Sequence, residues 1–259
     1  MEYVDQIGNK VKLKQVPKRI ISIVPSQSEF IWEIGLQKEL VGITKFCVHP
    51  EKMFANVTRV GGTKKLNFEI IRQLKPDLII GNKEENEKSQ IEELRKEFTV
   101  WMSDIYNLED SFKMMNSIGE ICGKEKEAKK VISTIKENFE KLNAKQFEKK
   151  KVAYFIWYNP FMVAANNTFI NFLLEKLGLV NVFKNKNRYP ELSASQIKKA
   201  NPQLILLSSE PFPFKEKHVK ELQNIVPNAK IVLVNGEMFS WYGSRLINAP
   251  HYFNSMKLN

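Results

Sequence analysis

One pattern of a short helix, a proline and an apolar strand occurs in each half of this chain. The segments NFEIIRQLKPDLIIGN (67–82) and SASQIKKANPQLILLSS (193–209) both begin with a capping residue and place Pro76 and Pro202 at matching positions. Proline ends a helix and restricts the residue before it, so the strand begins at the same point in both segments. Such an internal repeat predicts two related lobes, and 259 residues suffice for two hydrophobic cores.

Apolar runs and helical patterns alternate along the rest of the chain, which is typical of parallel sheets flanked by helices. The runs lie at 19–24, 40–44, 77–81, 98–102, 152–157, 203–209 and 230–236. The first helix is expected to be capped by Ser26 or Ser28 and to end at Gly35. Alternating side chains around Gly8 and Asn9 predict a β-hairpin at the start of the chain.

A segment with helical periodicity joins the two halves. Its apolar residues recur at helical spacing, and no glycine or proline lies between Lys124 and Lys151. The apolar positions are Ala128, Val131, Ile132, Ile135, Phe139 and Leu142. We therefore predict an α/β fold of two Rossmann-like lobes with parallel sheets joined by one long backbone helix: an N-terminal lobe with its hairpin at 1–123, a connecting helix at 124–150 and a C-terminal lobe at 151–259.

The positive net charge of +11 raises the question of a nucleic-acid partner. Much of the excess lies in 124–151, where 10 Lys accompany 5 Glu on the predicted connecting helix. No nucleic-acid recognition motif accompanies them, so a solvated helix face explains the charge and no nucleic acid is expected. No apolar run reaches membrane-spanning length, so no membrane insertion is expected either.

Polar and aromatic residues follow the predicted strands, at the carboxyl edge where open α/β sheets bind ligands. Pro25 and Ser26 follow the first strand, and His49 follows the second. A predicted cleft between the lobes is rich in ring-bearing side chains, namely Trp157, Tyr158, Phe161, Tyr189, Trp241 and Tyr242. Core packing is an equal alternative for Trp157, whereas Trp241 and Tyr242 lie between two glycines and are expected to be exposed. Such a cleft suits a broad apolar ligand with polar edges, which Glu237 and the backbone of 25–28 would fix.

Four segments, taken in order, resemble a known family. PKRIISIVPSQSEFIWEIG, VGGTKKLNFEIIRQLKPDLIIG, WYNPFMVAANNTFINFLLEKLG and ELSASQIKKANPQLILLSSEP are similar to segments of the bilobed substrate-binding proteins of ATP-driven importers for cobalamin, ferric siderophores and haem. The lobes of this helical-backbone metal receptor type are joined by a single long helix. The resemblance covers nearly the whole chain and is nearest to the cobalamin-binding member, in which aromatic side chains of both lobes sandwich a corrinoid.

The resemblance implies ligand-facing places for a set of residues and a docking role for two others. The ligand-facing set is Phe46, Thr63, Asn82, Met162, Tyr189, Glu237 and Trp241. Thr63 and Asn82 stand where the cobalamin binder has tryptophans, and Trp241 stands where it has an arginine. In this family an acidic residue of each lobe engages the permease; Glu69 matches the first, Ser195 occupies the second place, and Glu191 is the nearby substitute.

The expected function is therefore capture of cobalamin or an iron chelate for an ABC permease, outside the cytoplasm, by a monomer with no covalent cofactor and no bound metal ion of its own. Three alternatives stay open. A non-exported carrier of a tetrapyrrole-type cofactor accords with the absence of an export signal in MEYVDQIGNKVKL and with Ser195. A direct metal-ion binder has only His49, His218 and His251 to draw on, and an enzyme lacks any nucleophile motif or phosphate loop. Cys47 and Cys122 have no metal-type spacing and are expected to be buried thiols.

Overall fold

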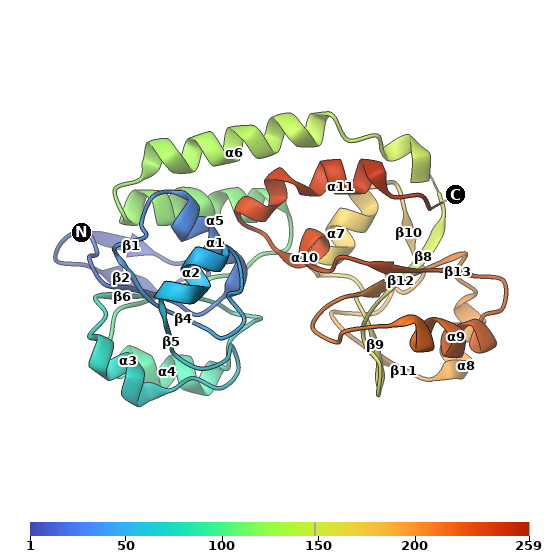
Figure 1. Cartoon of the computed structure of the whole chain (residues 1–259), viewed down its shortest axis with the longest axis horizontal. Coiled ribbons are helices and arrows are strands. Elements are labelled where there is room, and N and C mark those ends of the chain that lie inside the picture. Colours follow the sequence, from blue (N-terminus) through green and yellow to red (C-terminus); the bar gives the residue numbers. More distant parts are fainter. Residues whose placement is uncertain (148, 259) are drawn as a thin grey trace. The chain divides into compact units, whose positions relative to one another are not determined.

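The computed structural model describes residues 1–147 and 149–258 (Figure 1). The chain divides into two compact units, which are described separately below. The first unit consists of Met1–Lys136 and Tyr242–Ile247, and the second of Glu137–Trp241 and Asn248–Asn259. The three-part division into lobes and a connecting helix stays a prediction.

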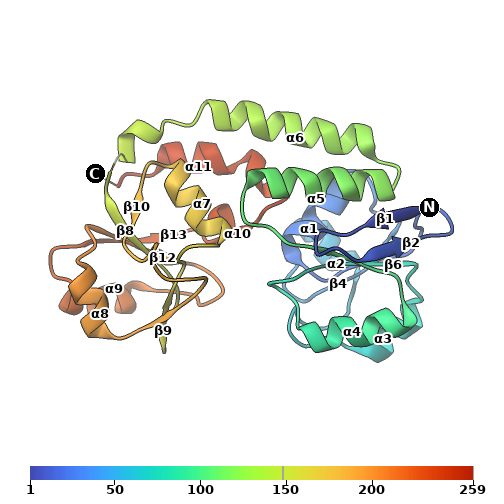
Figure 2. The same ribbon diagram turned by 180° about the vertical axis from the view of Figure 1, so that it is seen from behind.

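The first unit is built around a parallel sheet with the strand order β5-β4-β3-β6-β7. These strands are β3 (Ile20–Ser22), β4 (Leu40–Ile43), β5 (Thr58–Arg59), β6 (Leu78–Asn82) and β7 (Val100–Ser103). Figures 1 and 2 show α3 (Phe68–Leu74) and α4 (Lys88–Glu97) on one face, and α1 (Pro25–Glu33) and α5 (Leu108–Ile121) on the other. Both sheet faces are therefore covered, which explains why the strands read as continuous apolar runs rather than as an alternation. Two shorter helices, α2 (Glu51–Asn56) and the 3₁₀ helix η2 (Ser244–Ile247), complete this unit.

The predicted hairpin is present as β1 (Glu2–Val4) and β2 (Lys10–Lys12), which pair antiparallel. Its turn depends on the carboxylate of Asp5, whose Oδ1 accepts hydrogen bonds from the backbone N–H groups of Ile7 and Asn9. Gly8 has a φ of 88°, in the left-handed region that glycine adopts without strain. The Asp5 carboxylate also pairs with Arg95 of α4 at 3.0 Å, so the hairpin is attached to the body of the first unit.

The second unit contains a mixed sheet with the order β11-β9-β8-β12-β13, and β10 also pairs with β8. The strands β8 (Lys151–Trp157), β10 (Val180–Asn181), β12 (Leu204–Ser208) and β13 (Lys230–Val234) are parallel, as predicted. The edge strands β9 (Phe161–Val163) and β11 (Glu191–Leu192) add antiparallel pairs. One face carries α8 (Ala194–Ala200) and α9 (Glu216–Ile225), and the other carries α7 (Phe169–Lys176), α10 (Glu237–Ser240) and α11 (Ala249–Ser255) (Figures 1 and 2).

The predicted internal repeat is confirmed in both units. Helix α3 is capped by the side chain of Asn67, and α8 by that of Ser193, each accepting from a backbone N–H of the first turn. Both helices end at a left-handed residue, Lys75 with φ 46° and Asn201 with φ 45°. The proline follows, and β6 or β12 then begins. Each unit therefore contains one copy of the repeat, a capped helix followed by a central strand of its sheet.

The first helix is not capped as predicted. Its N-cap is Val24, and Ser26 and Ser28 lie inside the helix, where Ser28 Oγ donates to the carbonyl of Val24 at 2.8 Å. Pro25 occupies the first helical turn, where its missing N–H costs nothing and its fixed φ favours the helix, so no side-chain cap is needed.

Helix α6 (Glu125–Glu140), which lies in the predicted connecting segment, is shorter than that segment, and a 3₁₀ helix η1 (Ala144–Phe147) follows it. The apolar positions from Ala128 to Phe139 are buried as expected. A contact within the second unit explains the early end: Asn254 of α11 accepts from the backbone N–H of Asn143 and donates to the carbonyl of Lys141. Periodicity along the chain does not show such a contact.

Helices α5 and α6 approach closely at Gly119. A Cβ atom at this position would lie 2.6 Å from the Cβ of Ala128 and 3.2 Å from the carbonyl oxygen of Lys124. Replacing glycine by alanine inside a helix normally stabilises a protein by about 1 kcal/mol. Here we expect Gly119→Ala to lower the free energy of unfolding by about 1–3 kcal/mol, because the two helices must separate.

Urea denaturation measures this free energy, and Asn116→Ala, an exposed site on the same helix, is the matched control. The control should leave stability within about 0.5 kcal/mol of the unchanged chain. A stabilising effect of Gly119→Ala would show that the two helices do not pack as closely as described.

Candidate functional site

The loop after β4 presents an aromatic ring at the carboxyl edge of the first unit's sheet. Phe46 is 50% exposed, and the Nζ of Lys45 lies 5.1 Å from its ring centroid. Val48 is also exposed, whereas Cys47 between them is fully buried. The Cys47 Sγ lies 3.2 Å from both Ser28 Oγ and Thr44 Oγ1. Cys47 therefore anchors the loop from inside and leaves Phe46 facing outward.

The two cysteines are buried and free, as expected. Burial raises the pKa of the Cys47 thiol, although the hydroxyl groups of Ser28 and Thr44 oppose this shift. Burial raises the pKa of Cys122 to about 12, and the charges of Asp77 and Glu39 add to the effect. Because only the thiolate is an effective nucleophile and metal ligand, neither sulfur is poised for reaction.

We expect the native chain to resist a thiol reagent such as Ellman's reagent for minutes at pH 8, because both thiols are inaccessible and protonated. In denaturant, both cysteines should react at once. The measurement is the absorbance of the released chromophore over time. Rapid native reaction of either thiol, assigned with Cys47→Ser and Cys122→Ser, would contradict the described burial.

The N-terminus of α1 is closely packed within the first unit. Pro25 is half-buried, and Ser26 is 3% exposed. A Cβ atom at Gly243 would lie 2.4 Å from the carbonyl oxygen of Ser26, so only glycine fits beside this turn. The neighbouring Arg245 forms a bidentate ion pair with Glu29, with the shorter contact at 2.7 Å. The backbone of 25–26 is therefore fixed in place.

Asn82 lies in a buried polar network after β6. Its Nδ2 donates to Ser103 Oγ at 2.9 Å, and its Oδ1 accepts from the backbone N–H groups of Glu84 and Glu85. Asn82 is 2% exposed, so the side chain shapes the following turn. A ligand contact of Asn82 stays a prediction, and the same holds for half-buried His49.

Thr63 is connected to this network through its backbone. Its carbonyl accepts from the Nδ2 of Asn86, whose Oδ1 in turn accepts from the N–H of Asn82. The Thr63 side chain is half-buried. Asn86 and Ser103 carry no motif, so the sequence alone did not point to them.

In the second unit, ring-bearing side chains gather where β8 and β12 end. We call this group the aromatic cluster; it comprises Trp157, Tyr158, Phe161, Phe212, Phe214 and His218. The ring centroid of Tyr158 lies 5.7 Å from that of Phe212 in a stacked arrangement and 5.5 Å from that of Phe161 edge-on. The hydroxyl of Tyr158 donates to the carboxylate of Glu221. The aromatic cluster brings together Tyr158 and Phe161, two of the predicted ligand residues.

His218 is a buried member of the aromatic cluster. Its Nδ1 accepts a hydrogen bond from the backbone N–H of Lys215 at 2.9 Å, and its ring centroid lies 4.7 Å from that of Tyr158. Burial lowers the pKa of His218, and the charge of Lys217 lowers it further. The imidazole is therefore neutral at neutral pH and serves as a packed ring. The sequence offered His218 only as one of three histidines for a metal ion, and did not show its role in the aromatic cluster.

The other predicted ligand residues of the second unit lie at or near the edge strands. Met162 and Tyr189 are half-buried, and the guanidinium of Arg188 lies 5.9 Å from the Tyr189 ring centroid. Glu237 opens α10 and is half-buried. Their contacts with a ligand stay predictions.

The expected exposure of Trp241 and Tyr242 is wrong, because both are 6% exposed. Trp241 belongs to the second unit, where its Nε1 donates to the carboxylate of Glu210 at 2.9 Å. Tyr242 belongs to the first unit, and its carbonyl accepts from Ser111 Oγ. Satisfying the indole N–H removes the main cost of burying a tryptophan, and Glu210 was not identified from the sequence.

The two matching places of the repeat hold Glu69 and Ser195, and the candidate substitute Glu191 lies nearby in the sequence. Glu69 is exposed in the first turn of α3. The matching Ser195 is exposed in α8, with its Oγ 2.8 Å from that of Ser193. Glu191 is exposed in β11, opposite Met162 of β9. A docking role for Glu69 and Glu191 stays a prediction.

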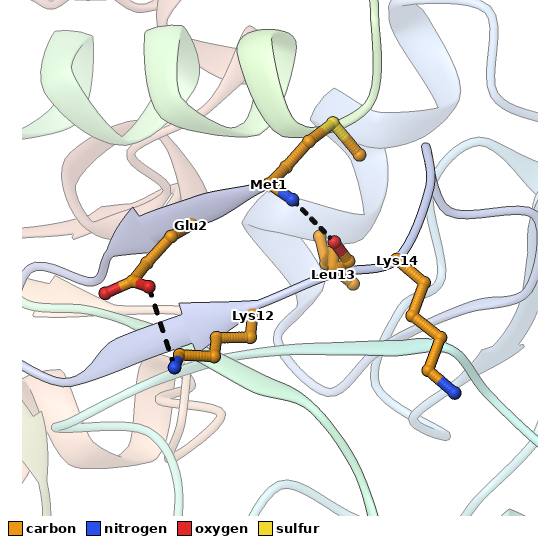
Figure 3. A pocket seen from close by; sticks show the side chains of 5 residues that line it. All are labelled: Met1, Glu2, Lys12, Leu13 and Lys14. Carbon is orange, nitrogen blue, oxygen red and sulfur yellow. Dashed lines mark hydrogen bonds and ion pairs between the residues drawn. The ribbon is translucent and has the colours of Figure 1, made fainter.

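Figure 3 shows a hollow beside the hairpin lined by Met1, Glu2, Lys12, Leu13 and Lys14; it contains none of the predicted ligand residues. Within residues 1–147 and 149–258, no group of three His, Cys, Asp or Glu side chains is arranged to hold a metal ion. No helix in that same part of the chain has the length and apolarity needed to cross a bilayer.

A family model described as periplasmic binding protein matches residues 20–227, most of the chain. The chain belongs to this family. Periplasmic binding proteins of this family are substrate-binding proteins of ABC transporters rather than enzymes, so the expectation that the chain captures a ligand and has no catalytic activity is confirmed.

Relatives of this family member include an uncharacterized ABC transporter substrate-binding lipoprotein of Bacillus subtilis, 25% identical over 94% of this chain and 81% of that protein. A vitamin B12-binding protein of Vibrio cholerae is 25% identical over 74% of this chain and 70% of its own length. Among solved structures, the Vibrio cholerae vitamin B12-binding protein BtuF has a TM-score of 0.78 at 21% identity, covering 91% of this chain and 94% of its own. A periplasmic heme-binding protein of Pseudomonas aeruginosa has a TM-score of 0.79 at 19% identity, covering 93% and 94%. These structures confirm the two-lobed α/β fold.

Proposed function

We propose that this periplasmic binding protein captures a metal-bearing macrocycle or chelate and delivers it to an ABC permease. Cobalamin or another corrinoid is the first candidate, and a ferric siderophore or haem is the next. Relatives named for vitamin B12 and structural neighbours named for B12, heme and iron support this ligand class.

The exposed ring of Phe46 is the observation that carries the proposal. A half-exposed phenylalanine is held at a strand end by a buried cysteine, and a cation lies against it. The ring lies at the carboxyl edge of a parallel sheet, where ligands of such sheets bind, and a rigid loop loses little entropy on binding. A flat, mostly apolar ligand with an anionic edge matches a ring beside a lysine.

The proposed ligand residues are those predicted from the sequence, without Trp241 and Tyr242, whose side chains are buried. In the first unit they are Pro25, Ser26, Phe46, His49, Thr63 and Asn82; in the second they are Tyr158, Phe161, Met162, Tyr189 and Glu237. The aromatic cluster supports Tyr158 and Phe161 most directly. The second candidate function is a non-exported carrier of a tetrapyrrole-type cofactor; the serine at the second docking place favours it over import.

A ligand screen tests this function. The purified chain is mixed with cyanocobalamin, haemin, the iron(III) complexes of a tris-catecholate and a tris-hydroxamate, and zinc ion alone. A probe at 100 times its Kd should stabilise the chain by about 2.7 kcal/mol and raise Tm by several degrees. The measurements are Tm and the visible spectrum of the probe. Stabilisation by zinc alone, or by none of the probes, would contradict the proposed function.

Docking to a permease is proposed to use Glu69 of the first unit and Glu191 of the second. Glu69→Ala and Glu191→Ala should each lower uptake about tenfold in cells that depend on this chain, since each removes a charge from a contact with a cationic partner. Ligand affinity in solution should not change.

Glu216→Ala, which removes an exposed carboxylate from α9, is the matched control and should leave uptake unchanged. Normal uptake with Glu191→Ala would remove Glu191 from the proposed docking contact. A loss of ligand affinity in either variant would indicate a role in capture instead.

A further inference from the structure

Trp157 occupies the carboxyl end of β8, the place where parallel strands most often present ligand contacts. It lies beyond the last residue of β8 that pairs with β12, and opposite Met162 of β9. Trp157 is 38% exposed. Among the described residues, the strongly exposed large apolar side chains include two aromatic ones, Phe46 and Trp157, and each follows or ends a strand of its own unit.

The indole of Trp157 is held in a defined orientation. Its Nε1 donates to the carbonyl of Asn159 at 3.2 Å, which satisfies the polar atom locally. The ring of Phe212 packs against it with centroids 5.6 Å apart and an interplanar angle of 66°. An aromatic side chain fixed in this way contributes contact area to a ligand with little loss of rotamer entropy.

Other rings of the aromatic cluster pack around Phe212 and keep it in place. Phe212 stacks on Tyr158 and meets Phe214 edge-on, with centroids 4.9 Å apart. His218 lies 5.1 Å from Phe212, and its ring is neutral and buried. The aromatic cluster is thus a packed support, and Trp157 is its most exposed member.

Trp241 cannot be the exposed aromatic contact of the second unit. Its side chain is 6% exposed, and its N–H is committed to Glu210 within the second unit. Of these two tryptophans, Trp157 therefore has the surface available for a ligand. Of the ring-bearing side chains predicted for the cleft, Trp157 rather than Trp241 is therefore the exposed tryptophan.

We propose that Trp157, positioned by Phe212, is the second unit's main contact for a flat or aromatic face of the captured ligand. The proposal rests on the proposed function and narrows its ligand class. Chelates that present only aliphatic arms to the protein should gain little from this surface, whereas a corrin, a porphyrin or a catecholate offers a face that stacks.

The test measures the Kd of cyanocobalamin, haemin and the iron(III) tris-catecholate and tris-hydroxamate complexes for the full chain and its variants. Trp157→Ala should weaken binding of the flat or aromatic probe at least about tenfold, and Trp157→Phe should retain affinity within about threefold. Phe172→Ala, which truncates a half-buried ring of α7 in the same unit, is the matched control and should bind normally. Thermal unfolding of each variant establishes that it is folded.

Tryptophan fluorescence gives a second readout. The bound probe should quench Trp157, and the quenching should fall clearly in Trp157→Phe because the nearest fluorophore has been removed. If Trp157→Ala binds the probes as tightly as the unchanged chain, this proposal is wrong, but the proposed ligand capture is not affected. A fall in uptake would not rescue the proposal, because it would then reflect contact with the permease. Binding of the tris-hydroxamate complex alone would also overturn it. Binding of no probe by the unchanged chain would overturn the proposed function, and this proposal with it.

Discussion

Parallel pairing of the central strands is the constraint on which each unit depends. In the first unit, β3 pairs with β4 on one side and β6 on the other; in the second, β8 and β13 flank β12. Parallel neighbours begin at one edge of the sheet and end at the other, so the loops that follow them share the carboxyl edge. Phe46 and Trp157 are at this edge because of the direction of their strands, not because of any local signal in the loops.

The repeat fixes where the central strands begin. The residue after each proline donates its N–H to a carbonyl where a neighbouring strand starts: Asp77 to Arg19, just before β3, and Gln203 to Lys151, the first residue of β8. Their side chains accept from backbone N–H groups of the same neighbouring segments. The two units therefore start their sheets with equivalent hydrogen bonds, made by a carboxylate in one and an amide in the other. This equivalence explains why helix, proline and strand occur together as one unit of sequence.

The sequence predicted these regular features well, because caps, prolines and short apolar runs act locally. The hairpin at Gly8, the repeat at Pro76 and Pro202, and the seven predicted strands are present, whereas the short strands β5, β9, β10 and β11 were not predicted. The predictions that were wrong depend on tertiary contacts, which the local sequence does not show. Helix α6 ends early where Asn254 meets the chain, and Val24 replaces a serine cap because Pro25 begins the helix. Nothing in the local sequence of α6 carries information about a side chain more than a hundred residues away.

The candidate site was predicted less completely, since a residue type does not determine its exposure. Trp241 and Trp157 both lie at the end of an ordered element, and each has a hydrogen-bond acceptor for its indole N–H. The acceptor of Trp241 is a carboxylate from another loop, and the side chain is buried. The acceptor of Trp157 is a carbonyl two residues along the chain, so its N–H is satisfied without burying the ring. The N–H of Trp157 has a partner nearby in the sequence, so the indole ring can stay exposed. The other rings of the aromatic cluster then hold this exposed ring in place for a ligand.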